Sequence, residues 1–205
     1  YESGKICLYT RGNGTIGTDI THLIDYGLNL PSFASPMEAS FMVRGELIIS
    51  KAIFKEKYSI EFKNIRNMVS GQVAKKHPDD KIISDIDFVA YEVIEPLNNL
   101  QKSLPFGPKG QSLALREAQS LVDQYHFLEK YKFKVVYNRV LEKEFIEQEI
   151  LMDYLNRRKK KSEYQIDGLV VTIIGKYTRN DSDNPKYAFA FKIQGETAEV
   201  RVDHV

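Results

Sequence analysis

The sequence lacks disulfide pairs, tryptophan and any hydrophobic run long enough to span a membrane. Its single cysteine, Cys7, excludes an internal disulfide and fits a reducing compartment. Cys7 lies in a strand-like run, so we expect a buried, unreactive thiol. The cysteine and the four histidines show no zinc-ligand spacing, and no signal peptide is visible. These absences favour an intracellular protein without a structural zinc site.

An excess of either charge is also missing, because 29 lysines and arginines are balanced by 28 aspartates and glutamates. The net charge of +1 points to no particular partner, so any nucleic-acid binding must come from local patches. The 205 residues are enough for one large domain or two small ones, with a sizeable core.

A lysine stands among apolar residues in the stretch AFAFKI at 188–193. Side-chain alternation predicts a strand with Lys192 on the same face as Ala188 and Ala190. The two alanines leave room above that face, where an ammonium needs an anion, a carboxylate or water. Lys192 is therefore either a phosphate ligand or a solvated lysine on a half-buried strand.

Two further stretches carry candidate ligand residues. Arg11 ends a predicted strand and begins a loop with three glycines, which suits a phosphate or a nucleotide but also a plain hairpin loop. The loop has the spacing of neither a Walker loop nor a dinucleotide fingerprint. In the strand 41–49, Arg44 and Glu46 share a face, so they either pair with each other or leave Glu46 for a ligand hydroxyl or a lysine.

Hydrophobic periodicity and turn signals predict the remaining elements. Strands are expected at 5–10, 41–49, 86–94, 164–174, 188–193 and 197–202, and a short strand or an extended link at 133–141. Helices are expected at 20–26, from Ser50 onwards, at 113–131 and at 143–161. Loops are expected at 64–71, 95–111 and 180–185. The last helix should bury Phe145, Ile146, Ile150, Tyr154 and Leu155.

Two details of these elements have alternative interpretations. The basic run at 157–161 either complements a helix dipole or forms a DNA-binding patch. The β-branched run at 164–174 indicates a buried strand, and Gly168 inside it indicates a bulge or the close approach of a ligand.

Five motifs occur in a fixed order along the chain. They are YTRGNGTIGTDIT at 9–21, VRGE at 43–46, FKNIRNMVSG at 62–71, IDGLVV at 166–171 and AFKI at 190–193. In the same order they resemble the TRGDGxxGEDVT, VRGE, FxNPRNxAAG, IDGVVxK and AYKFP segments of NAD-dependent DNA ligases. The resemblance covers nearly the whole chain and implies an adenylation (nucleotidyltransferase) domain over residues 1–205. It implies an α+β nucleotidyltransferase fold, similar to ATP-grasp ligases, with antiparallel and mixed sheets, flanking helices and a nucleotide pocket between them.

The resemblance also assigns roles to single residues. The family's adenylate-binding arginine, glutamate and lysine fall on Arg11, Glu46 and Lys192. The aromatic residue that stacks on adenine falls on Tyr91, and the aliphatic residue on its other side falls on Val170. A further position, Arg66, matches the arginine that faces the nicked DNA.

Several positions depart from the family pattern. Thr172 replaces a lysine that contacts phosphate, Asn13 replaces an aspartate, Ile65 replaces a proline, and Ala74 stands where a second DNA-facing arginine usually lies. These changes indicate a divergent member, with a virus as one candidate source. The family's nucleophilic lysine precedes the TRG segment, so we expect it outside the supplied residues and the domain to be incomplete at both ends. Residues 1–205 alone should then be inactive.

The implied reaction transfers AMP from NAD to an enzyme lysine and then to the 5′-phosphate of nicked double-stranded DNA, which seals the nick in replication and repair. The implied cofactors are NAD and Mg²⁺, and the implied partners are NAD or AMP and nicked duplex DNA. We expect a monomer without membrane contact, in the cytoplasm, the nucleoid or a virus factory. Two alternatives are a non-catalytic nucleic-acid-binding module with the same fold and a nucleotidyltransferase that uses ATP or GTP.

Overall fold

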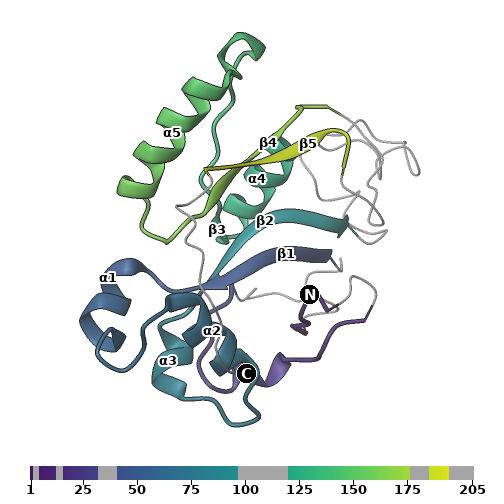
Figure 1. The fold of residues 1–205 in the computed structure, drawn as a ribbon. Helices are drawn as coiled ribbons and strands as arrows, with labels where there is room; N and C mark the ends of the chain where they lie inside the picture. The colour runs from purple at the N-terminus through teal and green to yellow at the C-terminus, as the bar shows by residue number, and fades with distance from the viewer. Residues whose placement is uncertain (2–4, 13–15, 32–40, 97–119, 176–184, 194–205) are drawn as a thin grey trace, which may run out of the picture.

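The computed structural model describes residues 1, 5–12, 16–31, 41–96, 120–175 and 185–193. Two small sheets and several helices make up this part of the chain (Figure 1). In the first sheet, β1 (Phe41–Ile48) pairs antiparallel with β2 (Asp87–Pro96), and β2 pairs parallel with β3 (Lys134–Val135). In the second, β4 (Gly168–Thr172) pairs antiparallel with β5 (Ala188–Lys192). The mixed α+β class and the strands around 41–49, 86–94 and 188–193 are thus confirmed.

Helices pack against the first sheet in two clusters, and each cluster has its own core. One core gathers side chains from η1 (Thr21–Ile24), α2 (Ile65–Val73) and α3 (Asp80–Ser84), including the fully buried Leu23 and Ile83. The other packs α4 (Leu121–Lys130) against β1 and β2 through aromatic rings, among them Phe41, Phe127 and Phe133.

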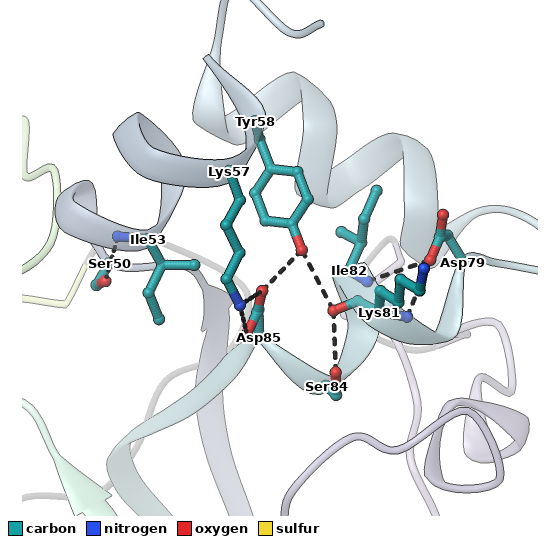
Figure 2. Close-up of polar contacts among 9 residues, drawn as sticks. All are labelled: Ser50, Ile53, Lys57, Tyr58, Asp79, Lys81, Ile82, Ser84 and Asp85. Carbon is teal, nitrogen blue, oxygen red and sulfur yellow. Dashed lines mark hydrogen bonds and ion pairs between the residues drawn. The ribbon is translucent and has the colours of Figure 1, made fainter. Parts of the chain in front are cut away.

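The residues that follow β1 form a helix because Ser50 caps it, as expected. The Ser50 side chain accepts a hydrogen bond from the backbone N–H of Ile53 at 3.2 Å. α1 (Lys51–Ile53) continues directly as the π-helical turn η2 (Phe54–Tyr58). Figure 2 shows that η2 is fastened to the end of α3, because Lys57 and the Tyr58 hydroxyl both donate to the carboxylate of Asp85.

The segment expected as a loop at 64–71 is a helix, α2, so that prediction was wrong. Asn64 caps it by accepting from the Asn67 N–H at 3.1 Å. The buried side chains of α2 recur at helical spacing, which its polar and small residues obscure in the sequence. They are Ile65, Met68, Val69 and Gln72. Helix α3, capped by Asp79, had not been anticipated.

Four other elements differ from expectation in length. The helix predicted at 20–26 is the single 3₁₀ turn η1, and the one at 113–131 is described only as α4. The short strand or extended link expected at 133–141 forms a strand only at β3. The helix at 143–161 splits into η5 (Lys143–Phe145) and α5 (Gln148–Lys161). Leu151 and Leu155 are the buried residues of α5, whereas Phe145, Ile146 and Ile150 are exposed.

The expected strand at 5–10 and the buried Cys7 are also corrected. Residues 5–10 are extended, but Tyr9 pairs with Asp19 only as an isolated bridge. Alternation turns Ile6 and Leu8 partly inward and leaves Cys7 exposed. Segments 97–119, 180–184 and 197–202, with the loops and strand expected there, lie outside the described residues, as does Asn13.

The run at 164–174 is a short strand of an exposed ribbon and not a buried strand. β4 pairs only with β5 in the described part of the chain, so one face of the ribbon meets solvent. Val170, Ile173 and Ile174 are consequently exposed. A polar cluster anchors the segment before β4, because the Tyr164 hydroxyl donates to Asp87 at 2.7 Å and Lys134 donates to the same carboxylate at 2.7 Å.

Gly168 allows β4 and β5 to approach closely, whereas the sequence analysis expected a bulge or the approach of a ligand; the pairing of β4 with β5 is regular and has no bulge. It pairs with Lys192, and a Cβ atom at Gly168 would lie 2.6 Å from the Phe191 carbonyl oxygen and 2.8 Å from Lys192 Cγ. Real Cβ atoms do not approach so closely, so the ribbon needs glycine here.

We predict that Gly168→Ala lowers the free energy of unfolding by about 1–3 kcal/mol, because the added methyl group forces the two strands apart. Gly71→Ala is the matched control, since open space surrounds its Cβ position in α2, and it should stabilise by about 0.5–1 kcal/mol. Urea unfolding measures both variants. Equal effects of the two substitutions would contradict the proposed contact.

We also predict a pH-dependent loss of stability at the Tyr164 anchor. Burial and the hydrogen bond to Asp87 raise the pKa of Tyr164 from 10.0 to about 12. The unfolded chain therefore releases this proton first, and the anchor's contribution is lost as the pH rises from about 10 to 12. The free energy of unfolding should fall more steeply over that range in the wild type than in Tyr164→Phe. Parallel curves would refute the anchor.

Candidate functional site

Two cations that are far apart in the sequence, Arg66 and Lys192, meet at the carboxylate of Asp167. Asp167 Oδ2 accepts from Arg66 Nη2 at 3.3 Å and from Lys192 Nζ at 3.5 Å. Arg66 comes from α2, Asp167 from the segment before β4, and Lys192 from the end of β5. The structure shows the Lys192 ammonium meeting a carboxylate at the surface, one of the three kinds of partner expected for it.

Local structure brings these side chains together. Asn64 caps α2, which begins at Ile65. The side chains of Ile65 and Met68 point into the core, so Arg66 lies on the exposed side of the helix. The register of the ribbon pairs Gly168 with Lys192, so Lys192 lies beside the residue that follows Asp167.

The two cations change the acidity of Asp167. Partial burial raises the pKa of the Asp167 carboxyl. The charges of Arg66 and Lys192 and the hydrogen bond from Lys192 together lower the pKa by more than burial raises it, so it lies below its ordinary value. The side chain is 57% exposed, so solvent screens both ion pairs and each contributes at most about 1 kcal/mol to stability. The arrangement places two positive groups near one oxygen atom and adds little to the stability of the fold.

A second group of candidate residues surrounds Tyr91, which is 37% exposed. Burial raises the pKa of the Tyr91 hydroxyl, and the charges of Arg44, Glu92, Glu46 and Arg11 also act on it. Arg44 forms an ion pair with Glu92 at 3.5 Å, so the alternative of an Arg44–Glu46 pair is not what the structure shows. Among the described residues Glu46 makes no ion pair and remains exposed.

Tyr91 owes its position to a β-bulge that sequence reasoning missed. Arg44 pairs with Glu92 and Gly45 pairs with Ala90, so Tyr91 is the extra residue on β2. Gly45 opposite the bulge cannot carry a side chain, because its Cβ would lie 2.5 Å from the Phe88 ring. The unusual glycine in VRGE was the one sequence signal for this irregularity.

The glycine-containing loop after Arg11 is closed like a hairpin. Thr10 N–H donates to the Thr18 carbonyl at 2.9 Å, and Ile20 N–H donates to the Leu8 carbonyl at 2.9 Å. Gly12 has a φ of +53°, and a Cβ atom there would lie 1.7 Å from the Ile16 carbonyl oxygen. The loop thus holds Arg11 at the start of a tight turn that only glycine permits.

The Asp167 cluster and the group around Tyr91 are separate in the described part of the chain. Lys192 forms no ion pair with Glu46 there, and its carboxylate partner is Asp167. Val170 is 76% exposed on β4, opposite Ala190. Two hollows in the described structure are lined by other residues, one around Cys7 and His22 and one around Tyr58 and Asp85. The convergence of all the candidate residues on one nucleotide pocket therefore stays a prediction.

The described residues contain neither a metal-binding cluster of side chains nor a membrane-spanning helix. They contain no group of three or more histidine, cysteine, aspartate or glutamate side chains placed to hold a metal ion. None of their helices has the length and apolarity needed to cross a membrane.

Comparison with known proteins explains why these motifs meet. The family model of the NAD-dependent DNA ligase adenylation domain matches residues 1–196. The chain belongs to this family. The membership confirms the resemblance of the five motifs, while the roles of single residues within this ligase family domain stay predictions.

Relatives of this ligase family occur in viruses and bacteria. The chain is 37% identical over 211 residues to a DNA ligase of Acanthamoeba polyphaga mimivirus, covering 100% of the chain and 29% of that protein. It is 35% identical to a putative DNA ligase of Invertebrate iridescent virus 3, covering 98% of the chain and 28% of that protein. A bacterial DNA ligase from Natranaerobius thermophilus is 28% identical, covering 100% of the chain and 30% of that protein. The chain thus spans less than a third of the length of these relatives.

We predict that the acidity of Asp167 reports the two ion pairs. In carboxyl-carbon NMR titrations, the pKa of Asp167 should lie below its ordinary value and should rise in Arg66→Gln and in Lys192→Gln, because each change removes one neighbouring positive charge. Lys186→Gln, which removes an exposed lysine before the other end of β5, should leave it unchanged. An unaltered pKa in both test variants would show that the contacts do not persist in solution.

Proposed function

We propose that the chain is the adenylation domain of an NAD-dependent DNA ligase. The protein that carries it would transfer AMP from NAD to an enzyme lysine, pass the AMP to the 5′-phosphate of nicked duplex DNA, and seal the nick. The observation that carries the proposal is the ion-pair cluster at Asp167, which unites residues of the FKNIRN, IDGLVV and AFKI motifs. A cluster of positive groups at the meeting point of three motifs suits a reaction among phosphates.

The first step forms a bond between a lysine nitrogen and the α-phosphorus of NAD and breaks the bond from that phosphorus to nicotinamide mononucleotide. The attacking amine must lose its proton, which a cation-rich surrounding favours. Negative charge on the phosphoryl oxygens increases towards the transition state. In the proposal Lys192 stabilises that charge from a position fixed by β5, with Arg11 as a second cation near the ribose or phosphate.

The nucleotide base and sugar would be held by the group around Tyr91. Tyr91 offers an aromatic face at the bulge of β2, and the exposed side chain of Val170 offers an apolar surface for the other side of the adenine. Glu46 carries a carboxylate that no cation neutralises among the described residues, so it can accept a hydrogen bond from a ribose hydroxyl.

Magnesium is part of the proposal as a companion of the substrate phosphates. Mg²⁺ usually keeps several waters and binds through one or two carboxylates plus phosphate oxygens, and a dedicated protein cage is unusual. The uncompensated carboxylate of Glu46 fits that pattern. When bound, the ion would screen phosphate charge; the residues of this chain would hold and orient the nucleotide.

DNA contact is proposed for Arg66, which is exposed on α2 and shares its carboxylate partner with Lys192. The two competing functions named from the sequence are tested by the same experiment. A binding module is suggested by Thr172, which lies on β4 where the family has a phosphate-contacting lysine. We further propose that the protein acts as an intracellular monomer.

The prediction concerns adenylate transfer by the protein that carries this chain. Incubation with NAD labelled in the adenylate phosphate should give a labelled protein, whereas labelled ATP should not. Lys192→Ala should lower the rate of labelling by about 100-fold or more, because one fixed cation at the phosphoryl group is lost. Lys186→Ala, an exposed lysine close to the same strand, should label like the wild type.

Three outcomes would contradict the proposal. Labelling from ATP alone would replace it with an ATP-dependent transferase. Labelling from neither nucleotide, with retained binding of nicked DNA, would replace it with the binding module. Normal labelling of a folded Lys192→Ala variant would remove the role given to Lys192.

A further inference from the structure

The C-terminal end of α5 carries five consecutive cations, Arg157–Lys161, here called the basic end of α5. Two of them have partners. Arg157 forms an ion pair with Asp153, and the Arg158 guanidinium stacks over the Tyr137 ring at 3.7 Å. The side chains of the remaining three are exposed and have no ion pair among the described residues. They are Lys159, Lys160 and Lys161.

A sixth cation is fastened to the same place. Lys51 Nζ donates to the Lys159 carbonyl at 3.1 Å, and the Lys51 backbone N–H donates to the Glu163 carbonyl at 2.9 Å. Glu163 makes no ion pair with the lysines in the described structure. Figure 1 shows this end of α5 close to α1 and leading into β4.

The helix dipole does not account for this concentration of charge. It corresponds to about half a negative charge at a helix C-terminus, and its effect is confined to the last turn. Even with Arg157 paired, the adjacent cations exceed that partial charge several-fold and repel one another, so an external polyanion would relieve their repulsion.

The chain limits how far the basic end lies from the Asp167 cluster. Lys161 and Asp167 are six residues apart, so their Cα atoms are separated by at most about 21 Å. In duplex DNA, phosphates along one strand advance by about 3.4 Å per base pair, so this limit corresponds to about six base pairs. A duplex whose nick lies at the Asp167 cluster would therefore offer phosphates to these lysines.

We propose that the basic end of α5 binds the phosphate backbone of duplex DNA within about six base pairs of the nick, on one side of it. The inference rests on the proposed function for the position of the nick. It assigns no base contact, so the contribution to binding is independent of sequence and strongly dependent on salt.

The test compares two charge-matched triple variants of the protein that carries this chain. The test variant is Lys159→Gln/Lys160→Gln/Lys161→Gln, and the control is Lys81→Gln/Lys130→Gln/Lys143→Gln, taken from α3, α4 and η5. Binding of nicked duplexes is measured by fluorescence anisotropy over a range of salt concentrations. Three nicked duplexes are compared. One has a long duplex arm on each side of the nick, and in each of the other two the arm on one side is shortened to about four base pairs.

The test variant should bind the long-armed duplex about tenfold more weakly at 0.1 M salt, and its slope of log K against log salt should be shallower by about 1–3. The defect should disappear when the arm on one particular side is short. A triple arginine variant should bind like the wild type. Thermal unfolding of all variants distinguishes lost contacts from lost folding.

The inference is overturned if the slope is unchanged, if the control variant shows the same defect, or if arm length makes no difference. An unchanged slope would be the result if the basic end served an acidic protein. Adenylate transfer from NAD should be normal in the test variant, so failure of this inference and failure of the proposed function are separately visible.

Discussion

The position of the β4–β5 ribbon depends on a partly buried polar contact, in which Tyr164 and Lys134 share the carboxylate of Asp87. A two-stranded ribbon is marginally stable by itself, and β4 and β5 pair only with each other in the described structure. Asp87 begins β2, Lys134 begins β3, and Tyr164 precedes β4, so the contact ties the ribbon to the end of the larger sheet. Asp167 lies three residues after Tyr164, so the contact between Tyr164 and Asp87 also positions the Asp167 carboxylate.

The ion pairs at Asp167 lie at the surface and contribute little to stability. Asp167 keeps Arg66 and Lys192 within hydrogen-bond distance of one oxygen. These contacts change the free energy of unfolding only modestly, because all three side chains are largely exposed. A phosphate is also an anion with several acceptor oxygens, so it can compete with the carboxylate for the same donors. In the proposed ligase domain, Arg66 and Lys192 therefore share one acceptor that a phosphate can replace.

The sequence predicted the parts of this arrangement that depend on alternation and caps. Strands β1, β2 and β5 and the Ser50 cap followed from local rules. The helix α2 was mistaken for a loop because its buried face includes Gln72, and its cap, Asn64, reads equally as a turn residue. The β-branched run of β4 suggested burial, yet a ribbon without a third described strand leaves Val170 exposed. Which cation shares which carboxylate, as at Asp167, depends on tertiary contacts that no local pattern contains.

The irregular pairing of β1 with β2 has a consequence for which side chains reach the outer face. The register shifts once at Tyr91 and again at Ile94, and two single-residue offsets restore the original phase. Ala90 and Val93 therefore both point to the core although three positions separate them, and both ends of β2 keep the alternation of an uninterrupted strand. Between the offsets, Tyr91 and Glu92 crowd onto the side that carries Arg44 and Glu46. The two bulges thereby gather four polar side chains from β1 and β2 on the outer face, while Ala90 and Val93 stay in the core.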